Sequence, residues 1–375
     1  MARDGSPLIL LDGASGHELK RRLDSIDSSC STPEATLAAQ KLHEEYIDAG
    51  ASVICTNTFL CTMHHISDDE DDDEDDDDDD DMNAWHQRSE KLQRSIKAGV
   101  RAALLAVQGN ERVRVAGCVP PLGECYVKPA VDEEESLKQY TDIVRAMLMS
   151  TKLSDDDGQK KTREMRNQVD IVLAETLSTS AEACAILRAL DTVLTHRETE
   201  IDGDTGIPRR LKVPEVWVSF TLDDGDEIER SARDGTNIPQ LRGGELLRDA
   251  IDAVMRVAAT LHANVTPRAL LLNCSSMDVS LDALRVLREE SDQRRDGFLI
   301  GIYPNAFNTP TGTWLRGGAA RDAPSGSCTL LVPEKEFAHI LTLARDAGAS
   351  IIGGCCGTTP SYMRVVYNSL LYKSS

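Results

Sequence analysis

Aromatic residues are scarce in this sequence, and it contains no long apolar run. Phe, Trp and Tyr make up 4% of the 375 residues although 41% are hydrophobic, so we expect a core of Val, Leu, Ile and Ala, as in buried parallel sheets. No apolar stretch approaches the roughly 20 residues of a membrane-spanning helix. The first five residues lack the basic and apolar regions of a signal peptide. We therefore expect a cytoplasmic protein that does not associate with membranes.

Basic patches are also missing. The formal net charge is -22, and the unbroken acidic run Asp68–Asp81 carries fourteen of these charges, so that the rest of the chain has a charge of -8. Such a surface repels phosphate backbones, and we expect no nucleic-acid partner. The run repels itself and cannot bury its side chains. We predict a disordered, solvated insertion at residues 67–82 of a single domain spanning 1–375; a docking or regulatory segment is the alternative.

Cysteines are too few for a disulfide scaffold, because ten in a chain of this length cannot replace a hydrophobic core. Several of them lie inside or at the ends of apolar runs, for example Cys55, Cys118 and Cys274. This usage indicates free thiols in a reducing compartment, some of them candidates for metal ligands.

Short β-rich runs alternate with longer helical patterns along the whole chain. The expected strands are 7–14, 52–59, 112–120, 169–176, 215–222, 268–275, 297–305 and 350–357. The expected helices are 33–49, 85–107, 133–153, 181–194, 243–262, 281–290, 334–347 and 359–372. Eight strand–helix units with nearly continuous apolar strands predict an α/β fold, a (β/α)8 TIM-type barrel with long loop insertions, including 154–167 and 223–243. A doubly wound open sheet is the alternative, but the usual glycine-rich phosphate motif is missing after the first strand.

Three cysteines lie at the ends of the sixth and eighth predicted strands, where TIM barrels carry their active sites. Cys274 lies at the end of the sixth strand, and Cys355 and Cys356 lie at the end of the eighth. Three thiolates with one open position are typical of a catalytic zinc site. Adjacent strand residues point to opposite faces, so the chain must bend for both Cys355 and Cys356 to reach one ion, and Gly353, Gly354 and Gly357 allow that bend. Alternatively, Cys274 is a small buried hydrophobe and the vicinal pair is inert or redox-active.

Two acids, Asp12 and Glu175, end otherwise apolar strands. They can bind an ammonium group through charge-assisted hydrogen bonds, while the turn Gly13–Gly16 offers backbone N–H groups to a carboxylate. Together these features describe a site for an α-amino acid. The alternative is a pair of structural carboxylates. His17, His64 and His65 are interpreted as solvated or structural.

These residues resemble the sequence pattern of the homocysteine S-methyltransferase family. Residues 12–19 (Asp-Gly-Ala-Ser-Gly-His-Glu-Leu) are similar to the opening motif of that family, and residues 56–59, 117–123 and 175–176 match further motifs. Asn273-Cys274 and residues 353–360 match its two zinc motifs. His17, Cys118 and Pro120 replace Thr, Ser and Gly of the family pattern.

The resemblance implies a Zn2+ ion on the three cysteines and transfer of a methyl group to the thiol of L-homocysteine, forming L-methionine. It implies substrate contacts from Asp12, Gly13, Ala14, Ser15, Asn57, Thr58, Glu175 and Asn273. No folate, cobalamin or activation module is recognisable, which favours a sulfonium donor, S-methylmethionine or S-adenosylmethionine. A betaine-type donor, or a non-catalytic zinc- or redox-regulated binding protein, remains as an alternative.

Overall fold

A computed structural model describes residues 7–23, 30, 32–66, 80–124, 132–149, 168–195, 200–201, 208–209, 212–263, 265–307 and 331–370. Its main feature is an eight-stranded sheet in which every pairing is parallel, in the order β1-β10-β9-β8-β7-β4-β3-β2. The strands are β1 (Ile9–Leu10), β2 (Val53–Cys55), β3 (Arg114–Val119), β4 (Ile171–Leu177), β7 (Glu215–Phe220), β8 (Pro267–Asn273), β9 (Leu299–Tyr303) and β10 (Ile351–Ile352).

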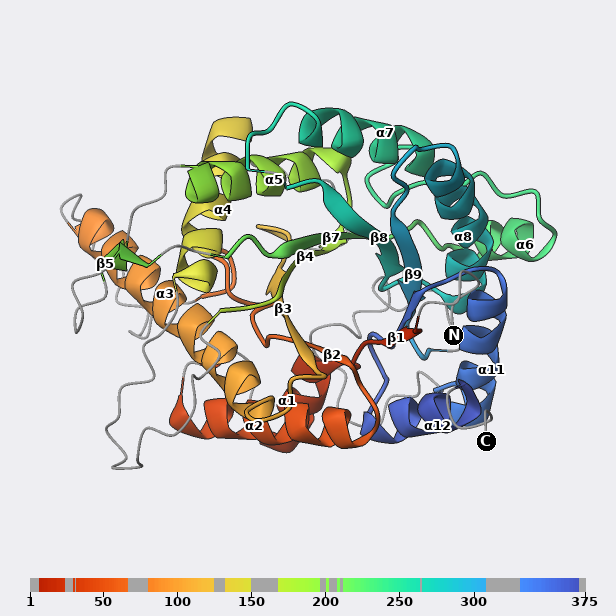
Figure 1. Ribbon diagram of the computed structural model, residues 1–375, viewed down its shortest axis with the longest axis horizontal. Coiled ribbons are helices and arrows are strands. Elements are labelled where there is room, and N and C mark those ends of the chain that lie inside the picture. Colours follow the sequence, from red (N-terminus) through yellow and green to blue (C-terminus); the bar gives the residue numbers. More distant parts are fainter. Residues whose placement is uncertain are drawn as a thin grey trace.

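The two outer strands of this sheet meet and close it into a barrel. Leu11, just after β1, forms a parallel bridge with Val53 of β2. The backbone N–H of Asp12 also donates to the carbonyl of Val53 at 3.1 Å. Helices surround the closed sheet (Figure 1). The predicted TIM-type barrel is therefore confirmed, and the doubly wound open sheet is wrong.

The helices follow the strands in the expected alternation. They are α1 (Ser15–Leu23), α2 (Pro33–Asp48), α3 (Asp80–Ala106), α4 (Glu133–Leu148), α5 (Ser180–Thr195), α6 (Asp226–Arg233), α7 (Leu247–Ala258), α8 (Met277–Asp292), α11 (Glu334–Asp346) and α12 (Pro360–Leu370). A short antiparallel pair, β5 (Glu200–Ile201) and β6 (Pro208–Arg209), lies outside the barrel sheet. Within the described residues, no helix has the length and apolar content needed to cross a membrane.

Two apolar clusters fill the molecule, one inside the barrel and one between the strands and the helices. The inner cluster contains alternate strand residues, such as Ile171 and Leu173 of β4 and the completely buried Trp217 of β7. The residues between them belong to the outer cluster, as Val172 and Ala174 do. Because successive side chains on a strand point to opposite faces, this alternation fixes which side chains face the barrel interior at the strand ends.

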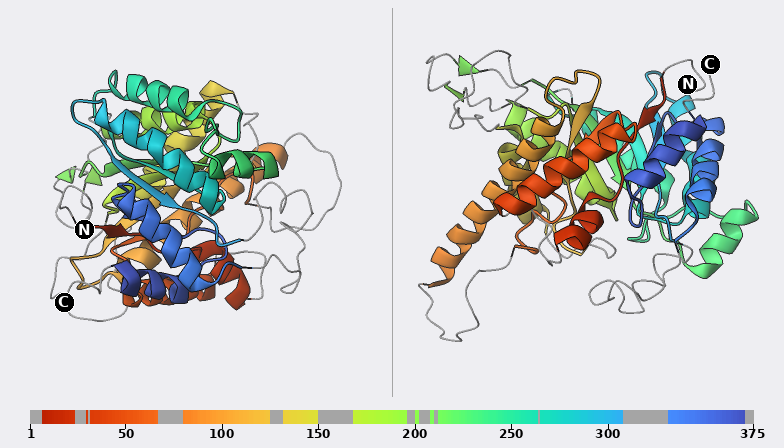
Figure 2. Two further views of the ribbon diagram at one scale, coloured as in Figure 1. Left: turned by 90° about the vertical axis from the view of Figure 1, so that its right-hand side faces the viewer. Right: turned by 90° about the horizontal axis from the view of Figure 1, so that it is seen from below.

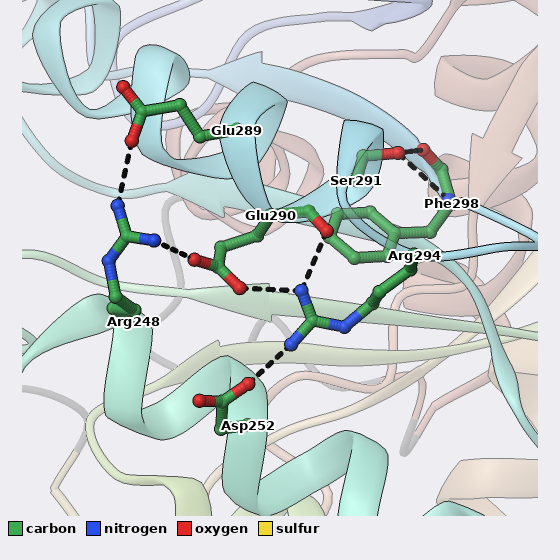
Figure 3. Close-up of polar contacts among 7 residues, drawn as sticks. All are labelled: Arg248, Asp252, Glu289, Glu290, Ser291, Arg294 and Phe298. Atoms are coloured by element: carbon green, nitrogen blue, oxygen red, sulfur yellow. Dashed lines mark hydrogen bonds and ion pairs between the residues drawn. The ribbon is translucent and has the colours of Figure 1, made fainter.

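A network of charges joins the barrel helices α7 and α8 (Figure 3). Glu290 of α8 is only 3% exposed and accepts hydrogen bonds from Arg248 of α7 and Arg294. Arg248 also contacts Glu289, and Arg294 contacts Asp252 of α7. The network therefore holds the C-terminal end of α8, the helix that begins three residues after Cys274.

The structure differs from the prediction mainly at element boundaries. Two helices, α1 and α6, were not expected; α6 lies inside the predicted loop 223–243, and both lie toward the same end of the barrel (Figure 2). Residues 67–79 and 154–167 lie outside the described part of the chain, so the disordered insertion stays a prediction. Helix α3 begins at Asp80, within the acidic run and before the expected residue 85, so the predicted disorder is wrong for residues 80–82.

Candidate metal centre and binding pocket

The three cysteines of the predicted metal site come together at the C-terminal end of the barrel strands. The Sγ atom of Cys274 lies 2.9 Å from that of Cys355 and 3.8 Å from that of Cys356, and all three sulfurs lie within 4.8 Å of one another. Zinc–sulfur bonds of about 2.3 Å in a tetrahedral site place two sulfurs about 3.8 Å apart. The Cys274–Cys356 distance matches this value, whereas Cys274 and Cys355 are closer and would have to move apart by about 1 Å to bind one ion. The donor set is that of a metal site with three thiolate ligands.

The backbone bends at both strand ends to bring these sulfurs together. Cys274 has a φ of 50° directly after β8, a left-handed conformation that is uncommon outside glycine. Gly357 has a φ of 83° and turns the chain after the vicinal pair. The N–H of Cys355 donates to the carbonyl of Pro304, and that of Cys356 donates to Oδ1 of Asn305. The expected departure from the strand is confirmed, since β10 ends at Ile352.

Without a cation, the surroundings of the three cysteines favour the protonated thiol over the thiolate. Hydrogen bonds with Cys274 and Cys356, together with burial, raise the pKa of the Cys355 thiol well above its ordinary value. A bound divalent cation reverses this tendency, because it favours the deprotonated, coordinating form of a thiol. The cluster thus has the chemistry of a site that is completed by a cation.

A cavity of about 160 Å³ extends from these cysteines across the barrel mouth. Seven of its lining residues come from the chain just after β1 and include the turn Gly13–Gly16. Its wall also contains the three cysteines, Asp12, Asn57, Glu175 and Thr176. The loop after β1 continues into α1, whose first N–H groups have no preceding helical carbonyl to bond. This end of the cavity is therefore suited to an anionic group.

Asp12 and Glu175 face the same cavity as the cysteines. Burial raises the pKa of Asp12 to about 8, opposed by the hydrogen bond from the Cys55 N–H to its Oδ2 at 2.8 Å. Burial likewise raises the pKa of Glu175 to about 7, opposed by a hydrogen bond from the Cys118 thiol. Burying two ionised carboxylates without a cation nearby is energetically unfavourable. An ammonium group bound in the cavity would offset this free-energy penalty.

The other predicted contacts divide between the cavity wall and the layer behind it. Gly13, Ala14, Ser15 and Asn57 line the cavity, although the N–H of Ala14 already donates to Oγ1 of Thr358 at 3.2 Å. Thr58 and Asn273 do not line it. Both are buried, and they hold other residues of the site in place.

Asn273 connects three strand ends through its carboxamide. Its Nδ2 donates to Oγ1 of Thr176 at 2.7 Å and lies 3.9 Å from Sγ of Cys355. Its Oδ1 accepts from Oγ of Ser219 at 2.7 Å. Thr176 has a φ of 61°, so this hydrogen bond stabilises an unusual backbone conformation next to Glu175.

Several cavity residues were not expected as site residues from the sequence. Cys55, Phe59 and Tyr303 line the cavity, and so does His17, which had been interpreted as solvated or structural. Tyr303 ends β9, the seventh strand of the predicted barrel, and Cys118 lies near the end of the third. Alternation along those two strands was the available signal, since both residues fall in the interior-facing register.

The fold and these contacts define a class: a TIM-barrel protein in which three clustered cysteines, suited to binding a metal ion, lie beside an acidic pocket at the barrel mouth. Comparison with known proteins agrees with this class. The family model for "Homocysteine S-methyltransferase" matches residues 9–370. The chain belongs to this family of enzymes.

Individual relatives are distant but match along most of the chain. Homocysteine S-methyltransferase 1 of Brassica oleracea var. italica is 23% identical over 88% of this chain and 82% of its own length. Homocysteine S-methyltransferase YbgG of Bacillus subtilis (strain 168) is 23% identical over 97% of this chain and 94% of its own. The metallated crystal form of the homocysteine methyltransferase MmuM from Escherichia coli has a TM-score of 0.60 at 21% identity, covering 98% and 97%.

Proposed function

We propose that this enzyme binds zinc through Cys274, Cys355 and Cys356 and transfers a methyl group from S-methylmethionine or S-adenosylmethionine to L-homocysteine in the cytoplasm. The observation that carries the proposal is the convergence of three thiols from two strand ends on a cavity that also contains two buried carboxylates. When bound, zinc supplies the positive charge that lowers the pKa of a substrate thiol and favours its nucleophilic thiolate form.

The residues of the pocket bind and orient the amino acid part of homocysteine. The carboxylates of Asp12 and Glu175 bind its ammonium group, which supplies the positive charge that their burial lacks. The substrate carboxylate interacts with N–H groups of the turn Gly13–Gly16 and the first turn of α1. The thiol then points toward the three cysteines, which lie in the same cavity.

Methyl transfer requires alignment and no general acid. An electron pair of the homocysteine sulfur forms the new bond to the methyl carbon, and the pair of the breaking bond stays on the donor sulfur. The sulfonium thereby leaves as a neutral thioether, so no proton has to be delivered to it. The role of the barrel is to hold thiolate, methyl carbon and leaving sulfur in line and to exclude water.

Methionine formation from homocysteine tests the proposal directly. We expect product with S-methylmethionine or S-adenosylmethionine, loss of activity with a chelator, and recovery on adding zinc. Product with betaine alone would overturn the assigned donor. Bound zinc without methionine from any donor would instead support the non-catalytic binding protein.

Replacing a ligand tests the metal centre. Cys274→Ala or Cys356→Ala should lower bound zinc, measured by elemental analysis, to less than about a tenth and activity by more than about a hundredfold, a loss at least as large as that of residues behind metal ligands. Cys184→Ala is the matched control, because Cys184 is a buried free thiol on α5, outside the cavity lining. Full zinc content in the Cys274 variant would refute the proposed ligand set.

A further inference from the structure

Cys118 lies behind Glu175 in the barrel interior. It is 1% exposed, and its Sγ donates to Oε2 of Glu175 at 2.8 Å. In the register of the sheet Cys118 pairs with Leu173, and Glu175 follows two residues later on the same face of β4. The topology of the barrel therefore points the Cys118 thiol at the Glu175 carboxylate.

The backbone of Cys118 is held on both sides by threonines that follow β2. The N–H of Cys118 donates to Oγ1 of Thr56 at 3.0 Å, and its carbonyl accepts from Oγ1 of Thr58 at 2.7 Å. The two threonine hydroxyls are themselves 2.8 Å apart. This arrangement gives Thr58 a definite role: it fixes the strand end that carries the thiol.

The thiol acts as a hydrogen-bond donor and not as a nucleophile. Burial and the neighbouring Glu175 raise the pKa of Cys118 well above its ordinary value, which keeps the proton on sulfur. A hydrogen bond donated to a carboxylate favours the charged form of that carboxylate. Glu175 would otherwise be driven toward its neutral form by burial, and a neutral acid is a poor partner for an ammonium group.

We propose that Cys118 is a positioning residue that holds the Glu175 carboxylate, ionised and correctly oriented, for the amino group of the substrate. This inference rests on the proposed function, since it assumes that the cavity binds homocysteine. It assigns a specific task to a position where the sequence has Cys in place of the Ser of the family pattern. A hydroxyl could perform the same task because it also donates a hydrogen bond.

Binding of two thiols to zinc-loaded protein tests this role, measured by calorimetry at pH 7.5. The first is homocysteine, and the second is 4-mercaptobutanoate, which has the thiol and carboxylate but lacks the amino group. In Cys118→Ala we expect homocysteine to bind about tenfold more weakly, the loss typical of one hydrogen bond to a charged group. Binding of 4-mercaptobutanoate should change less than about twofold, and Cys118→Ser should restore homocysteine binding to within about threefold. In turnover assays the same alanine variant should raise KM for homocysteine more than it lowers kcat.

The possible outcomes separate the inference from the proposed function. Equal weakening of both thiols in Cys118→Ala would show general damage to the pocket and overturn the positioning role, as would unchanged homocysteine binding. Cys184→Ala controls for the loss of a buried thiol. Wild-type protein that binds homocysteine but forms no methionine would refute the proposed function while leaving the comparison of the two ligands valid. Wild-type protein that binds no homocysteine would refute both.

Discussion

His43 of α2 is completely buried, and neither ring nitrogen has a hydrogen-bond partner among the described residues. Burial lowers its pKa from 6.5 to about 4. In the unfolded chain the ring binds a proton as the pH falls below about 6.5, whereas in the folded protein it stays neutral until about 4. Its contribution to stability is therefore intact above pH 6.5 and is lost progressively between pH 6.5 and 4.

We expect the protonation of His43 in the unfolded chain to lower the free energy of unfolding by about 3 kcal/mol as the pH falls from 6.5 to 4. His43→Leu should remove the loss, and at pH 7 it should be at least as stable as the wild type because it no longer buries two unpaired nitrogens. The measurement is the free energy of unfolding in urea at several pH values between 4 and 7.5, taken as the difference between variant and wild type. His339→Leu, at an exposed position on α11, is the control for replacing a histidine by leucine outside the core. Parallel curves for wild type and His43→Leu would refute the prediction.

At the scale of residues, the sequence predicted the cluster of three cysteines better than the residues that support the site. Cys274, Cys355 and Cys356 could be found because cysteines that gather at two strand ends, beside flanking glycines, are typical of a metal centre. The supporting residues Cys118 and Tyr303 look like ordinary core residues until the sheet register shows that they face the barrel interior. Asn273 was expected to contact substrate, but the structure places its carboxamide behind the cavity wall.

At the scale of elements, the charge network between α7 and α8 allows the stability of the fold to be changed without changing the catalytic site (Figure 3). Glu290→Gln keeps the shape of the side chain but leaves Arg248 and Arg294 facing each other without the buried carboxylate. We expect a loss of about 2–3 kcal/mol in the free energy of unfolding. Glu289→Gln is the control: Glu289 is 49% exposed, so its loss should stay below about 1 kcal/mol.

Activity at low temperature should be retained in both variants. The network lies at the C-terminal end of α8, whereas the cavity lies at the strand ends that precede the helices. Methionine formation at 15 °C and chemical unfolding at low and high salt would measure the two properties separately. Equal losses of stability in the two glutamine variants would show that the buried carboxylate contributes no more than an exposed ion pair.

Helices and strands were predicted where the apolar residues recur with a clear period. They were missed where polar residues or weak helix formers hide that period. Each barrel strand coincides with one of the expected runs, although β4 and β8 each extend one residue beyond theirs, and the first run, 7–14, contains only Ile9–Leu10 as strand. Its remaining residues leave the sheet to form the pocket, and an apolar pattern cannot show that departure. Helix α1 contains Gly16 and His17 in its first turn, which are weak helix formers. Helix α6 is so polar that it reads as a loop, although its Ala232 is buried.

At the scale of the whole molecule, barrel closure combines residues that are far apart in the chain. The bridge between Leu11 and Val53 places the loop after β1 next to the end of β2, and β10 pairs with β1 on the other side. Asp12, Cys55 and Cys355 thereby line one cavity although they come from both ends of the sequence. The order of strand–helix units predicted this closure, because eight of them complete a TIM barrel.

The acidic run is the largest feature that the site does not use, and its charge acts on the molecule as a whole. Residues 68–79 carry twelve negative charges on the segment that joins the loop after β2 to α3. The loop after β2, which precedes the run in the chain, contributes Asn57 and Phe59 to the cavity. Its potential should attract a cationic sulfonium donor at low ionic strength and be screened beyond about 8 Å in physiological salt.

Replacing residues 68–79 by a Gly/Ser segment of equal length should therefore leave kcat within about twofold at 150 mM salt, because screening suppresses the long-range attraction. At 10 mM salt the variant should show a higher KM for the donor than the wild type and an unchanged KM for homocysteine, whose net charge is close to zero. Steady-state kinetics at the two salt concentrations measure both effects, and the equal length of the segment keeps the connection to α3 intact. A large fall in kcat at both salt concentrations would instead mean that the run takes part in the catalytic site, since a long-range electrostatic effect would be suppressed at 150 mM salt.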